Sequence, residues 1–437
     1  MKVNVIGAGL AGVEAASALA REGFSVKLFE MKPHKKSPAH SYDGFAELVC
    51  SNSLKSKRIS SAAGMLKEEM LLLDSLTVKA AYAAQTPAGG ALAVDRYLFS
   101  DLITKQIREN PNIEVICEEI TGFPDGNTII CTGPLTGDKL AENIKIKMGG
   151  YLYFYDAAAP IISADSIDMD SIYFATRYDK GDADYINCPF EKDEYDRFYE
   201  ELINAETVKL REFEDAIVYE GCMPIETLAK RGSDSLRYGC MKPVGLINPK
   251  TRKRPYAVVQ LRLENNSKTL YNIVGFQTNL KFPEQKRVFS MIPGLKNLEF
   301  VRYGVMHRNT FLNSPKLLDD NFMLKNSNNV YFAGQITGVE GYMESAASGI
   351  VAGLSLAWRL KGREKLVLPN TSMMGALANY ISDGSISNFQ PMGANMGLLP
   401  VLDKPIKGKQ ERYESIALRG IGDLKNMLYN RDLRKVR

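Results

Sequence analysis

KVNVIGAGLAG, residues 2–12, decides the fold, because an apolar run leads directly into glycines spaced as GxGxxG. Residues 2–6 predict a short β-strand, and residues 13–22 carry Ala and Leu at helical spacing. Residues 26–29 predict a second strand, which ends at Glu30. A strand, glycine turn, helix, strand and terminal acid in this order are typical of a βαβ dinucleotide-binding unit.

The glycine pattern assigns a physical task to each glycine. Gly7 permits the tight turn, Gly9 lets a pyrophosphate approach the backbone, and Gly12 allows close packing of the helix. The helix N-terminus attracts phosphate charge, and Glu30 is expected to hold a ribose hydroxyl. A plain βαβ unit without a ligand is the alternative. The predicted cofactor-binding residues of this unit are Gly7, Ala8, Gly9, Leu10, Ala11, Gly12 and Glu30.

Two later segments favour FAD over NAD as the bound dinucleotide. Residues 127–132 predict a strand that ends at a Gly-Pro turn, as expected where a chain returns to the nucleotide sheet. Residues 329–333 predict another strand, followed by a glycine-rich turn and a helix of small residues over 345–353. The amides at such a helix start can face a flavin or its phosphates, although tight helix–sheet packing is the alternative. The additional predicted cofactor contacts are Gly133, Gly334, Gln335, Gly338, Ser345 and Ala346.

Length and composition indicate a folded α/β protein. The chain has 437 residues, of which 45% are hydrophobic and 24% charged, close to the globular average. We predict a Rossmann-like, two-nucleotide (glutathione-reductase-type) FAD-binding domain that carries an inserted α+β domain. Residues 1–150 form the N-terminal half of the FAD domain, residues 151–311 the insert, and residues 312–437 the C-terminal half with a basic tail.

Several classes of protein are excluded by composition. No stretch reaches the ~20 apolar residues of a membrane span, so we expect a cytoplasmic protein without membrane contact. Six cysteines without close pairs and only three histidines predict neither a disulfide framework nor a metal site. The net charge of +4 is weak evidence for nucleic acid, and basic clusters such as Lys55, Lys57 and Arg58 suit either phosphate contacts or a solvated face.

Cys50 and Cys222 stand in settings unlike those of the other four cysteines. Cys50 ends an apolar run and precedes Ser-Asn-Ser, and Cys222 lies in Gly-Cys-Met-Pro. A reactive thiolate needs a donor-rich, partly exposed site, which such turns can provide. A small buried hydrophobic residue is the alternative for either cysteine.

Long runs of the sequence also carry a family resemblance. They include the glycine loop at 7–12, FAELVCSNSL at 45–54, PAGGALAVDR at 87–96 and EGCMPIE at 220–226. Further matching runs are residues 38–40, 66–70, 151–160, 177–181, 241–245, 303–309 and 334–349. On these runs the chain resembles the folate- and FAD-dependent tRNA (uracil-5-)-methyltransferase family, TrmFO, over nearly its whole length.

The resemblance implies an activity and a set of cofactors. A one-carbon unit would pass from 5,10-methylenetetrahydrofolate to carbon 5 of the T-loop uridine of tRNA, with FAD as the carrier and NAD(P)H as the reductant. Cys222 matches the cysteine that attacks the uracil ring, and Cys50 the one that lies close to the flavin. Lys55, Lys57 and Arg58 would then meet RNA phosphates.

Some positions depart from the family pattern. These are residues 85–86, Cys240, Gly393 and Met396. They could alter the RNA-facing surface, so a uridine of large-subunit ribosomal RNA is the alternative target. A partner-dependent, wobble-modifying flavoprotein and an FAD-dependent oxidoreductase acting on a small molecule are the other hypotheses; the cysteine pair speaks against the first of these.

Overall fold

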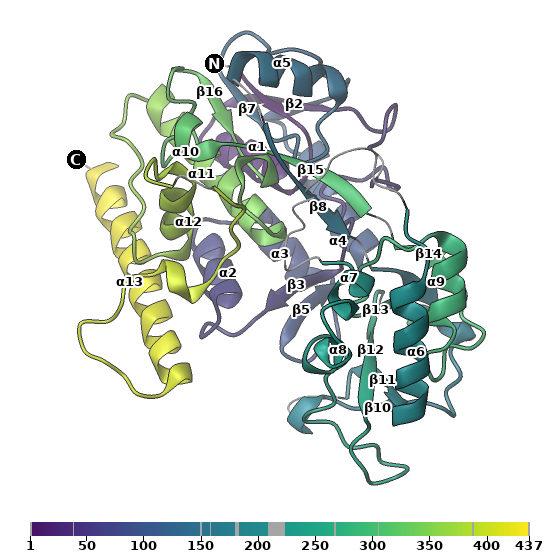
Figure 1. Cartoon of the computed structure of the whole chain (residues 1–437). Coiled ribbons are helices and arrows are strands. Elements are labelled where there is room, and N and C mark those ends of the chain that lie inside the picture. The colour runs from purple at the N-terminus through teal and green to yellow at the C-terminus, as the bar shows by residue number, and fades with distance from the viewer. Residues whose placement is uncertain are drawn as a thin grey trace.

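The computed structural model describes residues 2–37, 39–148, 151–157, 159–179, 183–208, 223–265, 268–304, 306–386 and 389–435. Figure 1 shows a larger lobe that contains both ends of the chain and a smaller lobe built from the middle of the sequence. The larger lobe holds the dinucleotide fingerprint, and the smaller lobe is the insert.

A five-stranded parallel sheet forms the centre of the larger lobe. Its strand order is β16-β7-β1-β2-β6, and every neighbouring pair is parallel. The strands are β1 (Lys2–Ile6), β2 (Ser25–Glu30), β6 (Ile113–Cys117), β7 (Thr128–Ile130) and β16 (Val330–Phe332). The last strand joins the sheet about 200 residues after β7, as the predicted return of the chain requires. The α/β Rossmann-like fold class is therefore confirmed.

Two glycine-containing helices pack closely on this sheet. They are α1 (Leu10–Arg21) and α11 (Tyr342–Leu360). A Cβ on Gly349 would lie 2.1 Å from the backbone oxygen of Ala11, and one on Gly353 would lie 2.9 Å from that of Ala15. Only glycine permits this separation of the helices, which brings the starts of α1 and α11 to the same end of the sheet.

The remaining elements of the larger lobe surround this core (Figure 1). They are β3 (Ser53–Ser56), α2 (Ala62–Leu72), α3 (Leu76–Ala83), β4 (Gln85–Thr86), β5 (Ala91–Val94), α4 (Arg96–Arg108), α5 (Asp138–Met148), α10 (Ser314–Leu317), η4 (Gln335–Thr337), α12 (Met373–Ser382), η5 (Met396–Leu398) and α13 (Lys409–Lys435). β3, β5 and β4 form a small antiparallel sheet. The C-terminal helix α13 buries Ile416, Ala417 and Leu424, so the basic tail is part of the packed lobe.

The insert is an antiparallel sheet with its own core. The strand order is β10-β11-β12-β13-β9-β14, and a separate cluster of buried side chains covers it. Its strands are β9 (Ile161–Ser163), β10 (Tyr173–Phe174), β11 (Tyr185–Phe190), β12 (Ala257–Leu263), β13 (Leu270–Ile273) and β14 (Phe300–Arg302). Its helices are η1 (Ala164–Ser166), η2 (Arg177–Asp179), α6 (Lys192–Asn204), α7 (Ile225–Ala229), α8 (Ser235–Tyr238) and α9 (Phe282–Phe289).

One two-stranded ribbon carries the chain between the lobes. β8 (Tyr151–Ala157) leaves the larger lobe and pairs antiparallel with β15 (Met306–Leu312), which returns to it. The boundaries that we propose, at residues 151 and 311, fall on these two strands. Across the described ranges, no helix is long and apolar enough to span a bilayer.

The contact between α1 and α11 yields a test with a matched control. Gly349→Ala inserts a methyl group against the Ala11 carbonyl, so we expect a loss of about 1–3 kcal/mol of stability. Gly422→Ala, in the interior of α13 with no atom near its Cβ position, should instead stabilise by about 0.5–1 kcal/mol. Denaturant unfolding of both variants checks this, and equal effects would contradict the packing argument.

Candidate active site

A first cavity opens at the end of the parallel sheet where α1 and α11 begin. It encloses about 1180 Å³ of empty space, including the part open to solvent. Segments far apart in the sequence form it: the first βαβ unit, the loop that carries His40 and Glu47, residues 118–120 after β6, residues 131–137 after β7, and residues at and before the start of α11. Of the predicted cofactor-binding residues, those that line the cavity are Gly7, Ala8, Gly9, Leu10, Ala11, Glu30, Gly133, Gly334, Gln335 and Ser345.

The backbone of this cavity fits the phosphates and ribose of a dinucleotide. Gly7 has φ +95°, and a Cβ there would lie 2.8 Å from the Cys131 backbone oxygen, so only glycine is accommodated. Glu30 is buried, and its Oε2 accepts a hydrogen bond of 2.8 Å from the Ala8 amide. Its Oε1 accepts one of 3.0 Å from the amide of Lys32. The carboxylate therefore fixes the glycine loop and still has lone pairs available for ribose hydroxyls.

Three predicted contacts do not line the cavity but support its walls. A Cβ on Gly12 would lie 1.8 Å from the Gly7 oxygen, so Gly12 permits the close turn. Gly338 has φ +85° and lies against the ring of Phe389. Ala346 is fully buried in the core, because it lies on the inner face of α11. Any part these three residues play in cofactor binding is indirect.

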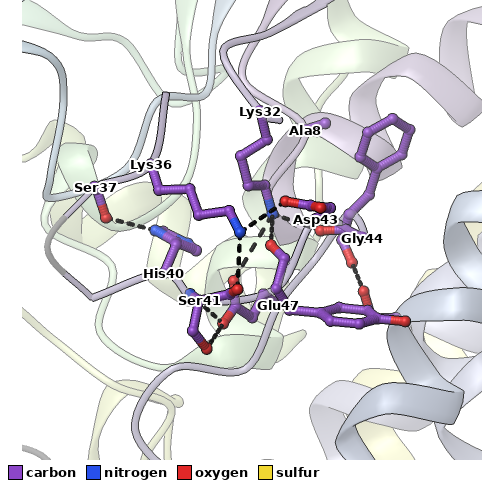
Figure 2. A network of polar contacts seen from close by, with 12 residues as sticks. Ala8, Lys32, Lys36, Ser37, His40, Ser41, Asp43, Gly44 and Glu47 are labelled. Atoms are coloured by element: carbon purple, nitrogen blue, oxygen red, sulfur yellow. Dashed lines mark hydrogen bonds and ion pairs between the residues drawn. The ribbon is translucent and has the colours of Figure 1, made fainter. Parts of the chain in front are cut away.

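A polar loop lines one side of the first cavity through His40, Ala46 and Glu47. Figure 2 shows the polar contacts that hold this loop. The buried ammonium of Lys32 holds this loop by donating to the backbone oxygens of Gly44 at 2.5 Å and Tyr42 at 3.3 Å. The carboxylate of Glu47 accepts from the amide and hydroxyl of Ser41 at 2.9 and 3.1 Å. Burial lowers the pKa of Lys32 and also that of His40, so the imidazole of His40 is neutral near pH 7.

A second cavity adjoins the first and shares His40 and Glu47 with it. Its other lining residues come from both lobes: Ala39, Ser41, Tyr42, Arg96, Tyr97, Ile161, Glu264, Leu270, Phe282, Val301, Arg302 and Tyr303. Two buried carboxylate oxygens, Glu47 Oε2 and Glu264 Oε1, have no hydrogen-bond partner within the described residues. The guanidinium of Arg302 likewise has no hydrogen bond or ion pair with the part of the chain that the structure describes, and burial lowers its pKa. Glu47 Oε2 lies 3.8 Å from the Lys32 ammonium in a buried ion pair, so the lining of the cavity combines two buried carboxylates with the Arg302 guanidinium.

Cys50 lies beside the first cavity, half-buried, on the segment that leads to β3. The hydroxyl oxygen of Tyr342 accepts hydrogen bonds from the amides of Cys50 at 2.7 Å and Ser51 at 3.1 Å. Burial raises the pKa of Tyr342, and a charge on Cys50 would raise it further. Because Tyr342 lines the first cavity, one phenol ties the cysteine segment to the predicted flavin site.

A buried polar network behind Cys50 joins the two lobes. From the insert, Arg262 donates to Asn52 Oδ1 at 3.0 Å and to the hydroxyl of Ser51 at 2.8 Å. Arg96 of α4 donates to Glu264 Oε2 through Nε at 3.0 Å and Nη2 at 2.8 Å. Four of these five residues, Arg262, Asn52, Arg96 and Glu264, are buried, and Ser51 is half-buried. We call these residues the seam.

The remaining cysteines and the basic cluster lie in different environments. Cys222 lies outside the described residues, which resume at Met223 just before α7. Burial raises the pKa of the thiols of Cys131 and Cys188, which suits small core residues. Lys55 forms a 2.7 Å ion pair with Glu344. Within the described ranges, no group of His, Cys, Asp and Glu side chains could hold a metal ion.

Fold and site together define a two-lobed, dinucleotide-binding protein of flavoprotein type. The family model described as "Glucose inhibited division protein A" matches residues 2–364. GidA of Aquifex aeolicus, in one crystal form, has a TM-score of 0.71 at 16% identity, over 98% of this chain and 73% of that one. At this identity the likeness establishes the fold.

Two curated relatives carry the same name, "Methylenetetrahydrofolate--tRNA-(uracil-5-)-methyltransferase TrmFO". The relative from Halalkalibacterium halodurans is 58% identical over 427 residues, 98% of this chain and 98% of the relative. The relative from Acetivibrio thermocellus is 57% identical over 425 residues, 97% of this chain and 98% of the relative. The chain therefore belongs to the TrmFO family, and the resemblance seen in the sequence is confirmed.

The sequence did not single out Tyr342, Arg96, Glu264, Arg302 or Glu47 as site residues. Glu47 lies in the FAELVCSNSL run, Arg96 ends the PAGGALAVDR run, and Tyr342 lies in the run at 334–349, so these three residues belong to runs that carry the resemblance. For these three residues the available signal was membership in the runs, because no spacing relates a phenol near residue 340 to a cysteine at residue 50; Glu264 and Arg302 lie in none of the runs and carried no signal.

Tyr342→Phe tests the link between the cavity and Cys50. Loss of the hydroxyl leaves two amides without their acceptor, so we expect a loss of about 1–3 kcal/mol in stability and a fall in catalytic turnover. The matched control is Tyr380→Phe, which removes a hydroxyl bonded to the Gln390 oxygen at 2.9 Å, away from the cavities. Thermal unfolding and turnover are measured for both. Unchanged turnover in Tyr342→Phe would contradict a role in positioning Cys50.

Proposed function

We propose that this chain is a folate- and FAD-dependent enzyme that methylates carbon 5 of a uridine in tRNA, with 5,10-methylenetetrahydrofolate as the one-carbon donor and NAD(P)H as the reductant. The observation that carries the proposal is a dinucleotide cavity with a cysteine segment fixed at its side by Tyr342. The name of the 58% identical relative agrees with this chemistry. The proposed RNA substrate also places the protein in the cytoplasm.

The first cavity fits FAD. The amides at the start of α1 and Gly9 suit the pyrophosphate, Glu30 suits a ribose, and Gly334 with Ser345 at the start of α11 suits the isoalloxazine end. When bound, FAD supplies one-carbon carriage and redox chemistry, which no protein side chain provides. The described residues of the chain supply binding, orientation and the exclusion of water.

The two candidate cysteines act on the uracil ring and on the one-carbon unit. Carbon 5 is a poor nucleophile until a thiolate adds to carbon 6, and we assign this addition to Sγ of Cys222. Carbon 5 would then bond to the one-carbon unit, and loss of the carbon-5 proton with cleavage of the bond between the unit and its carrier nitrogen would leave an exocyclic methylene on the ring. A hydride, supplied ultimately by NAD(P)H, would reduce this methylene to methyl, and departure of the Cys222 thiolate from carbon 6 would restore the ring double bond. Cys50, beside the first cavity, is assigned to the handling of the one-carbon unit.

The second cavity suits the folate. A pterin carries several N–H donors, which suit a cavity lined by the carboxylates of Glu47 and Glu264, and the glutamate tail carries carboxylates that can pair with Arg302. Because the cavity shares His40 and Glu47 with the first, a donor bound there lies next to the predicted flavin site.

Arg302→Gln tests this placement. We expect the KM for methylenetetrahydrofolate to rise by about 10-fold or more, because a charge-assisted bond is lost, with FAD content unchanged. Arg287→Gln is the control, since Arg287 lies on the surface of the insert in ion pairs with Glu201 and Glu284. Steady-state kinetics measures both variants, and an unchanged KM in Arg302→Gln would overturn the folate placement.

The activity is tested with methylenetetrahydrofolate labelled in its methylene group and NAD(P)H, offered to unmodified tRNA and to ribosomal RNA separately. We expect label in tRNA, none after Cys222→Ala, and retained label after Cys188→Ala, which alters a buried core cysteine. If label appeared only in ribosomal RNA, the proposed substrate would be wrong, whereas the proposed chemistry would stand. No label from FAD-loaded protein would overturn the function and favour a small-molecule oxidoreductase.

A further inference from the structure

Two sequence runs without a role in this chemistry meet on the insert. Arg177 Nη1 donates to the backbone oxygens of Lys242 at 2.6 Å and Val244 at 2.9 Å. The amide of Tyr178 donates to the Gly245 oxygen at 2.8 Å. Residues 177–178 and 242–245 therefore form one structural unit, held by three hydrogen bonds.

This unit presents an aromatic ring to solvent from a strained backbone. Tyr178 has φ 61° and ψ 24°, the left-handed region that a bulky residue rarely adopts. Its side chain is 60% exposed, yet one face of the ring packs on Gly245, where a Cβ would lie 3.0 Å from three ring carbons. A non-glycine residue held in this way costs about 1–3 kcal/mol and is typical of functional positions.

This unit lies close to the larger lobe, because a Cβ on Gly89 would lie 3.9 Å from the side-chain methyl of Thr176, two residues before Tyr178. The amide of Gly89, from the larger lobe, donates to Asp184 Oδ2 at 2.6 Å, close to the strand that follows Tyr178. The neighbouring Tyr185 is hydrogen-bonded to Arg262, and Arg262 donates to Ser51 next to Cys50. Tyr178 thus lies on the insert side of the junction between the lobes.

Cations flank this junction from both lobes. Arg58 of the larger lobe is exposed, and its guanidinium lies 3.5 Å from the Cβ position of Gly90. Lys242 of the insert is also exposed. Neither side chain has an ion pair within the described residues, so both charges are available to a partner.

We propose that this surface, made of Tyr178, Arg58 and Lys242, is a contact site for the RNA substrate. Tyr178 stacks on an unpaired base, and the two cations bind backbone phosphates on either side of the lobe junction. A flat ring beside uncompensated cations suits a folded loop of RNA, because unstacked bases and phosphates occur there together. The inference rests on the proposed function and names the residues that recognise its partner.

The first test removes the ring without adding strain. Tyr178→Gly suits a left-handed backbone, so the variant is expected to fold and keep its FAD. Its Kd for unmodified tRNA should rise by about 5- to 100-fold, the range typical of loss of one base stack, with kcat at saturating RNA unchanged. Tyr178→Phe should bind like wild type because the ring remains. Tyr429→Ala, which removes an exposed ring from α13 on the opposite side of the molecule, is the control (Figure 1).

The second test uses salt. Arg58→Gln should reduce the slope of log binding constant against log salt by about 0.7–0.9, as expected for the loss of one phosphate contact, whereas Lys425→Gln on α13 should leave it unchanged. Wild-type binding in Tyr178→Gly together with methylation of tRNA would overturn the contact site and leave the proposed function intact. Failure of the wild-type protein to bind or methylate RNA would overturn both.

Discussion

The seam between β12 and the Cys50 segment is the interaction on which the arrangement of the lobes depends. Arg262 and Glu264 are two residues apart at the end of an extended strand, so both side chains point to the same face. A buried charge is strongly unfavourable unless it is paired and hydrogen-bonded. The insert can therefore pack only in the register in which Arg262 meets Asn52 and Glu264 meets Arg96. An apolar contact would tolerate sliding, which this seam does not.

The same seam also builds the candidate site. Glu264 accepts from Arg96 through one carboxylate oxygen, and the same residue lines the second cavity. Arg262 fixes the two residues that follow Cys50, while Tyr342 fixes the amide of Cys50 from the opposite side. The position of the cysteine is thus determined by both lobes and by the start of α11. Docking of the lobes and assembly of the site are one event.

The local part of this architecture could be predicted from the sequence, and the long-range part could not. Residues 2–30 show their strand, turn, helix and terminal acid contiguously, and the structure has them at nearly those bounds. The return of the chain before Gly334 was also predictable, because a strand followed by glycines and a small-residue helix is a local pattern. The second cavity joins residues from near 40, near 96 and 264–303, which no spacing relates. The sequence did not predict Tyr178 as a distinct feature, because no residue pattern indicates that its side chain is exposed or that its backbone is left-handed.

The position of the lobe junction constrains how a large RNA could use a small cavity. Cys50 is half-buried, and enzymes that act on a base take it out of its stack, so in the proposed reaction the target base would reach the junction alone. In the contact site that we propose, the rest of the RNA would lie across both lobes, with Arg58 on one side of the junction and Lys242 and Tyr178 on the other. Extruding one base leaves a neighbour without its stacking partner, and an exposed ring held by Gly245 can replace that partner. Binding across the junction would favour the docked arrangement of the lobes, which is the arrangement that completes the second cavity.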